Sequence, residues 1–82
     1  MNRGELSRAL SVRAGIDRKT ADRVIAALFD ARHGVGILAD ALDRGERVVI
    51  TGFGTFSVRE RPGGPSRAPR FRPSTPLRER LG

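Results

Sequence analysis

The sequence predicts a small α+β fold in which helices come first and an antiparallel sheet follows. Residues 1–45 carry apolar side chains at helical spacing, interrupted by glycine-containing breaks. Residues 46–73 contain β-branched and alternating stretches typical of strands. Helix-capping residues near position 75 indicate a short helix over residues 74–82. These observations predict an N-terminal helical hairpin, a short third helical segment, a three-stranded antiparallel sheet and a terminal helix.

The first helix is marked at both ends. Asn2 lies three residues before Glu5, which is the spacing of a capping box, so a helix should begin there. Gly15 is well placed to end the helix in a left-handed conformation. The apolar stripe between these ends comprises Leu6, Ala9, Leu10 and Ala14, with Val12 at its flank.

The second helix should begin after Asp17, a favoured N-cap residue. Its predicted apolar face contains Ala21, Val24, Ile25, Leu28 and Phe29. Two helices joined by a short turn form either a plain helical hairpin or a helix-turn-helix reader of the DNA major groove. The outer face is mixed in charge rather than cationic, which favours the hairpin; it carries Arg18, Lys19, Asp22, Arg23 and Asp30.

Glycines interrupt the helical pattern between Arg32 and Gly36, and each costs about 1 kcal/mol relative to alanine within a helix, so a loop is predicted there. A short helical stripe follows and ends at Gly45. His33, the single histidine, has no cysteine, aspartate pair or second histidine near it in the sequence. A solvated loop residue is therefore favoured over a metal ligand or an acid–base group.

The most informative stretch is Gly-Phe-Gly-Thr-Phe-Ser-Val-Arg-Glu-Arg at residues 52–61, which follows the β-branched run 47–51. Its two glycines permit a tight reversal around Phe53. Beyond the turn, alternation places apolar and polar side chains on opposite faces: Phe56 and Val58 on one, and Ser57, Arg59 and Arg61 on the other. The pattern predicts an apolar floor under a cationic surface, although an ordinary amphipathic hairpin has the same alternation.

Prolines and glycines dominate residues 62–69, which predicts a turn or a tip rather than a regular central strand. The segment 70–72 can form a short returning strand with Phe71 directed inward. A terminal helix should then begin with Thr75 as its cap and Pro76 at its first position.

The charge is strongly basic and unevenly placed. Sixteen Lys and Arg residues against nine Asp and Glu residues give a net charge of +7. Residues 1–58 hold nine basic and seven acidic side chains, whereas residues 59–82 hold seven and two. This concentration is typical of a protein that binds a polyanion. All but one of the basic residues are arginine, which suits bidentate contact with phosphate, although the codon bias of a GC-rich genome produces the same preference.

Several other classes of function are disfavoured. There is no cysteine, no nucleophile or phosphate-binding motif and no cluster of metal ligands, so we expect neither an enzyme nor a cofactor. No apolar run approaches the roughly 20 residues that span a bilayer, and no signal-peptide core is present, so a soluble, cytoplasmic protein without membrane or small-molecule partners is expected. With no Trp or Tyr and four Phe, stacking on single strands or RNA is also disfavoured. A single domain over residues 1–82 is small enough that oligomerisation is expected to stabilise it.

The chain resembles the HU/IHF family of bacterial histone-like DNA-binding proteins. The resemblance covers nearly the whole sequence and is most specific at residues 52–61, at Met-Asn-Arg-Gly-Glu-Leu over 1–6 and at Phe71-Arg72-Pro73. It implies an intertwined dimer, either with itself or with a paralogue, in which helices form the base and sheets form a saddle over duplex DNA. It also implies a nucleoid location and two β-ribbon arms whose tips insert a proline wedge into the minor groove.

The resemblance and the charge pattern together give two sets of candidate residues. The resemblance places DNA contacts at Arg3, Gly52, Gly54, Arg59, Arg61, Arg72 and Arg78, and charge and alternation add Arg67 and Arg70. The expected dimer core comprises Leu6, Leu10, Val24, Leu28, Phe29, Leu42, Phe53, Phe56 and Phe71.

The sequence departs from the family pattern in two places. Only nine residues separate Arg61 from Phe71, no Arg-Asn-Pro motif occurs, and Pro65 is the nearest residue to a wedge. A few extra residues from His33 to Gly36 are expected to form a loop insertion. The expected function is therefore sequence-independent duplex binding with weakened bending. The alternative is an arm-deficient dimerisation subunit that modulates a full-armed paralogue and binds little DNA itself.

Overall fold

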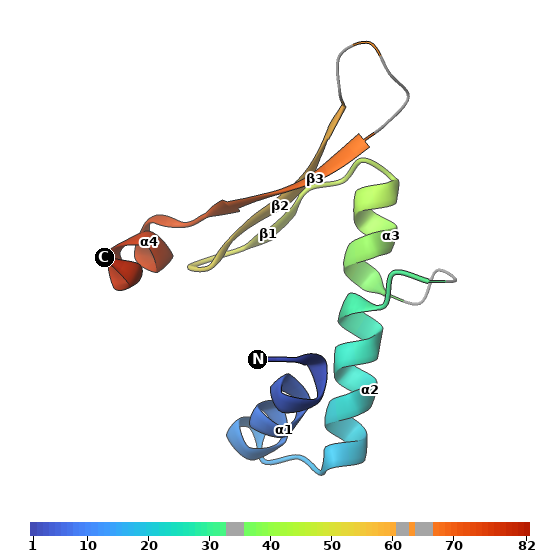
Figure 1. Ribbon diagram of the computed structural model, residues 1–82, viewed down its shortest axis with the longest axis vertical. Coiled ribbons are helices and arrows are strands. Elements are labelled where there is room, and N and C mark those ends of the chain that lie inside the picture. The colour runs from blue at the N-terminus through green and yellow to red at the C-terminus, as the bar shows by residue number, and fades with distance from the viewer. Residues whose placement is uncertain (33–35, 61–62, 64–66) are drawn as a thin grey trace. The chain divides into compact units, whose positions relative to one another are not determined.

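A computed structural model of the chain describes residues 1–32, 36–60, 63 and 67–82. The helices are α1 (Arg3–Ala14), α2 (Arg18–Phe29), α3 (Ile37–Asp43) and α4 (Thr75–Leu81), and the strands are β1 (Val48–Ile50), β2 (Gly54–Glu60) and β3 (Arg67–Pro73) (Figure 1). The predicted α+β class and order of elements are confirmed. The chain forms two compact units, residues 1–40 and 41–82, so the boundary falls within α3. No described helix is long and apolar enough to cross a membrane.

The ends of α1 and the start of α2 follow the local sequence signals. The N–H of Glu5 donates to Oδ1 of Asn2 at 2.8 Å and the N–H of Asn2 donates to Oε1 of Glu5 at 3.2 Å, which completes the capping box. Gly15 ends α1 with a φ of 69°. Asp17 caps α2 by accepting from the N–H of Thr20 at 2.7 Å. Hydrogen bonds from the side chain and the backbone of Thr20 lower the pKa of Asp17.

The contact between α1 and α2 is partly polar. Ala21 and Ile25 are buried as expected, but the buried residue of α1 is Ser7, which the apolar stripe did not include. Its hydroxyl donates to Oδ1 of Asp22, and Arg18 Nε lies 3.2 Å from the same oxygen. Asp22 is exposed, as its predicted place on the outer face requires, but it also accepts the hydrogen bond that the buried Ser7 hydroxyl needs. The hydrogen bond from Ser7, and secondarily that from Arg18, lower the pKa of Asp22.

The predicted break before the third helical segment is confirmed in the described residues, because α2 ends at Phe29 and α3 begins at Ile37. The backbone of Gly36 lies directly against that of Asp30, and a Cβ on Gly36 would lie 2.8 Å from the Asp30 nitrogen. Glycine is therefore required where the chain returns to the end of α2. His33 lies outside the described residues.

The sheet has the order β1-β2-β3 and is antiparallel throughout (Figure 1). The register places Phe56 opposite both Val48 and Phe71. The ring of Phe71 lies 4.9 Å from that of Phe56 and 5.5 Å from that of Phe53, measured between centroids. These three rings form the phenylalanine floor, which is the apolar face that the alternation predicted.

The two glycines of the turn between β1 and β2 have different physical roles. Gly52 has a φ of 83°, and the N–H of Phe53 donates to the carbonyl of Ile50 at 2.9 Å to close the turn. Gly54 is the first residue of β2 and is buried. A Cβ on Gly54 would lie 2.5 Å from Cε1 of Phe71, so its lack of a side chain allows the ring to pack against the strand.

Two boundaries differ from the predictions. Strand β3 begins at Arg67 and includes Pro69, although residues 67–69 were assigned to the tip. Proline is tolerated because β3 is an edge strand, where a missing N–H need not break the sheet. Helix α4 is capped by Ser74 rather than by Thr75, since the Ser74 hydroxyl accepts from the N–H of Leu77 at 3.3 Å.

Candidate nucleic-acid interface

The sheet presents three arginines on the face opposite the phenylalanine floor, and we call this the cationic face. Each arginine stands opposite a small side chain on the neighbouring strand: Arg59 opposite Ala68, Arg70 opposite Ser57, and Arg72 opposite Thr55. No two arginines are directly opposite one another, which avoids a destabilising pair of like charges. Arg70 and Arg72 are two residues apart on one strand, so their Cα atoms are separated by roughly 6.7 Å.

The arginines of the cationic face are available for a ligand. Arg59, Arg70 and Arg72 are exposed. Within the described part of the chain, none of the three forms an ion pair, since the pairs found involve other arginines. Arg59 therefore lies on the face of β2 that the alternation predicted. Its contact with DNA stays a prediction. Arg61 lies outside the described residues.

Arg67 does not belong to the cationic face. It pairs in register with Glu60, which places it on the side of the phenylalanine floor. Its Nη2 lies 2.7 Å from Oδ1 of Asp43, and its Nη1 donates to the Asp43 carbonyl at 2.9 Å. Arg67 is three positions from Arg70 and five from Arg72 along β3. Because side chains alternate between the two faces of a strand, these odd offsets place Arg67 on the opposite face from both.

Arg3, in the N-terminal unit, is also engaged within the chain. Its Nη1 lies 2.8 Å from Oδ1 of Asp30, so the ion pair joins the start of α1 to the end of α2. Both side chains are partly exposed, at 54% and 36%. A phosphate would therefore have to compete with Asp30 for this guanidinium.

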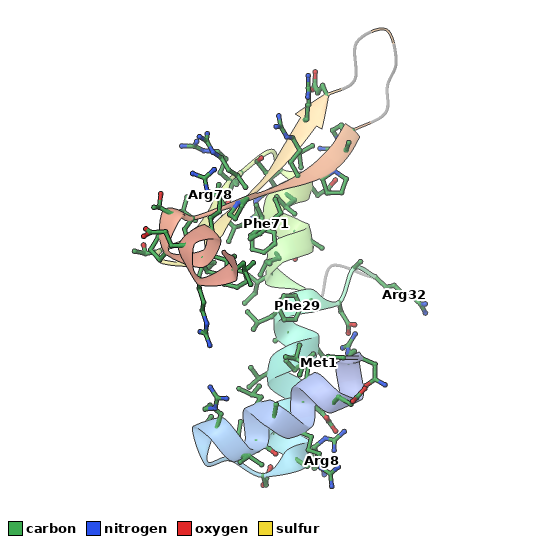
Figure 2. All side chains as sticks on the ribbon, turned by 60° about the vertical axis from the view of Figure 1, so that its left-hand side comes forward. Met1, Arg8, Phe29, Arg32, Phe71 and Arg78 are labelled. Carbon is green, nitrogen blue, oxygen red and sulfur yellow. The ribbon has the colours of Figure 1, made fainter. Side chains whose placement is uncertain are left out.

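A pocket of about 450 Å³ lies at the end of the sheet, where the β1–β2 turn meets the start of α4. Its lining includes four of the predicted DNA-contact residues, Gly52, Gly54, Arg72 and Arg78, and no acidic residue. Figure 2 shows Arg78 on α4. The complete lining is Arg47, Val49, Ile50, Thr51, Gly52, Gly54, Thr55, Arg72, Pro73, Ser74, Thr75 and Arg78.

Arg47 is a pocket residue that the sequence-based set missed. It lies one residue before β1 and two before Val49, which pairs with Thr55. Extending the alternation of β1 backwards by one step would have placed Arg47 on the side of Thr55 and Arg72. The signal was present, but it depends on the β1–β2 register.

The candidate dimer-core residues remain partly exposed in the single chain. Phe29 and Phe53 are each 47% exposed and Phe71 is 43% exposed. The buried apolar residues among those described are only Ala21, Ile25 and Ala41. Leu6 and Val24 are also exposed, whereas Leu10, Leu28, Leu42 and Phe56 are half-buried.

The N-terminal unit contains its own apolar pocket, of about 280 Å³, lined in part by Met1, Leu6 and Phe29. Figure 2 shows Met1 and Phe29 in this unit. In the described part of the chain, no group of three or more His, Cys, Asp or Glu residues could hold a metal ion.

The comparison with known families decides the assignment. A family model described as bacterial DNA-binding protein matches residues 1–70. The chain belongs to this family, which includes HU and IHF. It is 36% identical over 69 residues to DNA-binding protein HU of Geobacillus stearothermophilus, across 84% of this chain and 70% of that protein. It is 31% identical over 80 residues to integration host factor subunit alpha of Bordetella pertussis, across 98% of this chain and 66% of that protein.

Solved HU structures share the fold. An HU mutant from Thermotoga maritima superposes with a TM-score of 0.78 at 30% identity, and the match covers both chains completely. The Anabaena HU–DNA cocrystal structure gives a TM-score of 0.82 at 29% identity, covering 99% of this chain and 97% of that one. The HU/IHF resemblance inferred from the motifs is thereby confirmed.

Proposed function

We propose that this protein binds duplex DNA in the bacterial nucleoid by contacting the phosphate backbone and the minor groove without reading sequence. The observation that carries the proposal is the cationic face, on which Arg59, Arg70 and Arg72 are exposed and have no ion pair within the described residues. Guanidinium groups bind phosphate oxygens bidentately, and each neutralised phosphate releases counterions. The family membership and the HU–DNA cocrystal neighbour support this function.

The acting form is proposed to be a dimer. Phe29, Phe53 and Phe71 would be covered by a second subunit, which the small buried core of the single chain also favours. The subunit is taken to be a second copy of this chain, and a paralogue is the alternative.

Bending is proposed to be weaker than for a full-armed HU protein. Only six residues, 61–66, connect the end of β2 to the start of β3. Because an extended residue advances about 3.3 Å, six residues are too few to supply a long two-stranded arm. Fluorescence energy transfer between the ends of a labelled duplex would measure the bend, with a full-armed HU as reference. A comparable bend angle would contradict the proposal.

The central test compares two arginines of the same strand. Arg70→Gln removes a charge from the cationic face, whereas Arg67→Gln removes an equal charge from the opposite face. The slope of log affinity against log salt should become shallower by about 1.8 for Arg70→Gln, because a homodimer loses one phosphate contact in each of its two subunits. Arg67→Gln should leave this slope unchanged and instead lower the unfolding temperature, because it breaks the contacts with Asp43.

The same salt titration also distinguishes duplex binding from the alternative function. Duplex binding that is unmeasurable even at low salt would overturn the proposal and favour a dimerisation subunit. Equal slope changes for the two variants would show that net charge, rather than the cationic face, governs binding.

A further inference from the structure

Part of the β2–β3 pair has no third strand beside it (Figure 1). Strand β1 pairs with residues 54–56 of β2, whereas residues 57–60 pair with residues 67–70 of β3 and, among the described residues, with no other strand. We call residues 57–60 and 67–70 the ribbon end. The three rings of the phenylalanine floor lie outside it. Two paired strands alone are marginally stable in water, so the ribbon end needs a further contact to stay ordered.

Two of the three arginines of the cationic face belong to the ribbon end. Arg59 and Arg70 each stand opposite another residue of the ribbon end. Arg72 stands opposite Thr55, which also pairs with β1, so Arg72 belongs to the three-stranded part. The order of the ribbon end therefore decides whether Arg59 and Arg70 are held in place before a ligand arrives.

Arg67 joins the ribbon end to helix α3. It is the first residue of β3, and Asp43 is the last residue of α3. Nη2 of Arg67 donates to Oδ1 of Asp43 at 2.7 Å, and Nη1 donates to the Asp43 carbonyl at 2.9 Å. Carbonyls of the last helical turn have no partner within the helix, and the helix dipole favours a cation there. In the described part of the chain, no other side-chain hydrogen bond or ion pair connects the ribbon end to another element.

We propose that Arg67 and Asp43 are positioning residues for DNA binding, because their contact keeps the ribbon end closed, with Arg59 and Arg70 in place. The inference rests on the proposed function, since it concerns the same duplex. Arg67 faces away from the cationic face, so it acts through the strand rather than on DNA. An open ribbon end must close before both arginines bind, and the apparent affinity falls with the fraction of molecules that are closed.

The expected effect on affinity is limited by the strength of the contact. The side chains of Arg67 and Asp43 are 44% and 77% exposed, and an exposed ion pair shifts an equilibrium by up to about fivefold. Loss of the contact should therefore weaken duplex binding by up to about fivefold for each subunit. The bound state keeps its phosphate contacts, so the slope of log affinity against log salt should not change.

The first experiment examines the ribbon end without DNA. In Arg67→Gln, backbone amide chemical shifts of the ribbon end should move towards the values of unstructured chain, because the end is open in more of the molecules. The shifts of residues 54–56, in the three-stranded part, should change little. Unchanged shifts at the ribbon end, or equal changes along all of β2, would overturn the inference.

The second experiment measures duplex affinity with a matched control. Asp43→Ala and Asp40→Ala each remove one negative charge from α3, and Asp40 forms no ion pair within the described residues. A more positive protein should bind DNA more tightly in general. We nevertheless expect Asp43→Ala to bind more weakly than Asp40→Ala, by up to about fivefold for each subunit. Equal affinities of the two variants would contradict the positioning role.

Combined substitutions show which arginines depend on the contact. In an Arg59→Gln/Arg70→Gln background, binding no longer requires a closed ribbon end, so Asp43→Ala should add little further loss. In an Arg72→Gln background, the loss caused by Asp43→Ala should persist in full. Equal losses in the two backgrounds would show that Asp43 does not act through the ribbon end.

The two proposals fail in distinguishable ways. If the wild type binds duplex while Asp43→Ala and Asp40→Ala bind equally, the positioning role is wrong and the proposed function stands. If the wild type binds no duplex at low salt, the proposed function fails and the positioning role fails with it, whatever the chemical shifts show about the order of the ribbon end.

Discussion

At the level of single residues, the arginines of the sheet differ in what their guanidinium groups contact. Arg67 is held by a carboxylate and a carbonyl of Asp43, whereas Arg70, three residues later, has no ion pair among the described residues. The same residue type therefore serves either the fold or a ligand. An exposed pair such as Arg67–Asp43 contributes at most about 1 kcal/mol.

Gly54 is the residue whose substitution should damage the sheet most directly. A Cβ there would lie 2.5 Å from Cε1 of Phe71 and 2.7 Å from the Arg72 carbonyl, and the backbone cannot move away cheaply. Gly54→Ala is expected to lower the free energy of unfolding by about 3 kcal/mol, at the upper end of overpacking costs. Denaturant unfolding monitored by circular dichroism would measure it.

Gly4 supplies the matched control for this substitution. It lies in α1, and a Cβ there would make only ordinary contacts at 3.5 Å. Gly4→Ala should raise stability by up to about 1 kcal/mol through helix propensity. A Gly54→Ala variant as stable as wild type would show that the close packing of Phe71 is not required.

At the level of elements, the α1–α2 hairpin depends on a hydrogen bond as well as on apolar burial. Ser7 is only 1% exposed, and its hydroxyl is bound by Asp22. Loss of either partner leaves a buried polar group or a carboxylate without its donor. The stability of the hairpin should therefore fall at acidic pH.

The pH dependence follows from the lowered pKa of Asp22, which falls below its ordinary value of 3.8 mainly because of the hydrogen bond from Ser7. A carboxyl group with a lower pKa in the folded state stabilises the fold fully above the unfolded value and loses this effect as the pH falls through the folded value. At pH 6 the wild type should thus melt at a higher temperature than the Asp22→Asn variant, and the difference between the two melting temperatures should shrink below pH 3.8.

Thermal melts of both proteins at low salt, at pH 6 and pH 3, would test this expectation. Ser7→Ala provides the control, because without the hydroxyl the Asp22→Asn substitution should matter less at either pH. A melting difference that is independent of pH would show that the Asp22 charge does not stabilise the hairpin.

At the level of the whole molecule, the described part of a single chain buries few apolar side chains and leaves several large ones exposed. The described buried apolar residues are two alanines and one isoleucine, whereas Phe29, Phe53 and Phe71 are each more than two fifths exposed. A dimer that folds as it associates would cover such side chains.

The unfolding temperature should therefore rise with protein concentration, since a dimer that unfolds to two chains is stabilised by mass action. Phe71→Ala should lower dimer stability by about 3 kcal/mol, as expected for a phenylalanine that is fully covered. Val12→Ala should have little effect, because Val12 is not among the residues expected to form the dimer core. A monomeric mass by sedimentation, with a melting temperature independent of concentration, would contradict the dimer.

Much of the fold was predictable because its signals are local. The capping box at Asn2, the cap at Asp17 and the left-handed Gly15 were all predicted and are confirmed. The cap of α4 was displaced by one residue because Ser74 and Thr75 are both good capping residues, and only the backbone geometry distinguishes them. The extent of β3 was underestimated because its prolines are acceptable only on an edge strand.

The candidate interface was only partly predictable, for a physical reason that individual residues illustrate. Alternation placed Arg59 on the polar side of β2, and that inference needs nothing beyond the strand itself. The position of Arg47 in the pocket and the binding of Arg67 to Asp43 both depend on contacts between segments distant in the sequence. Alternation along β1 indicates the face of Arg47 only once the β1–β2 register is known, and nothing in the local spacing indicates the partner of Arg67.

The sequence by itself determined the order of helices and strands, the family and the concentration of positive charge, because each of these is encoded in short-range spacing, in motifs or in composition. The tertiary structure decided which arginines are free and which are held, that Gly54 must lack a side chain, and that Ser7 is buried against Asp22. These features depend on strand register and helix packing, which bring together residues that no local pattern connects.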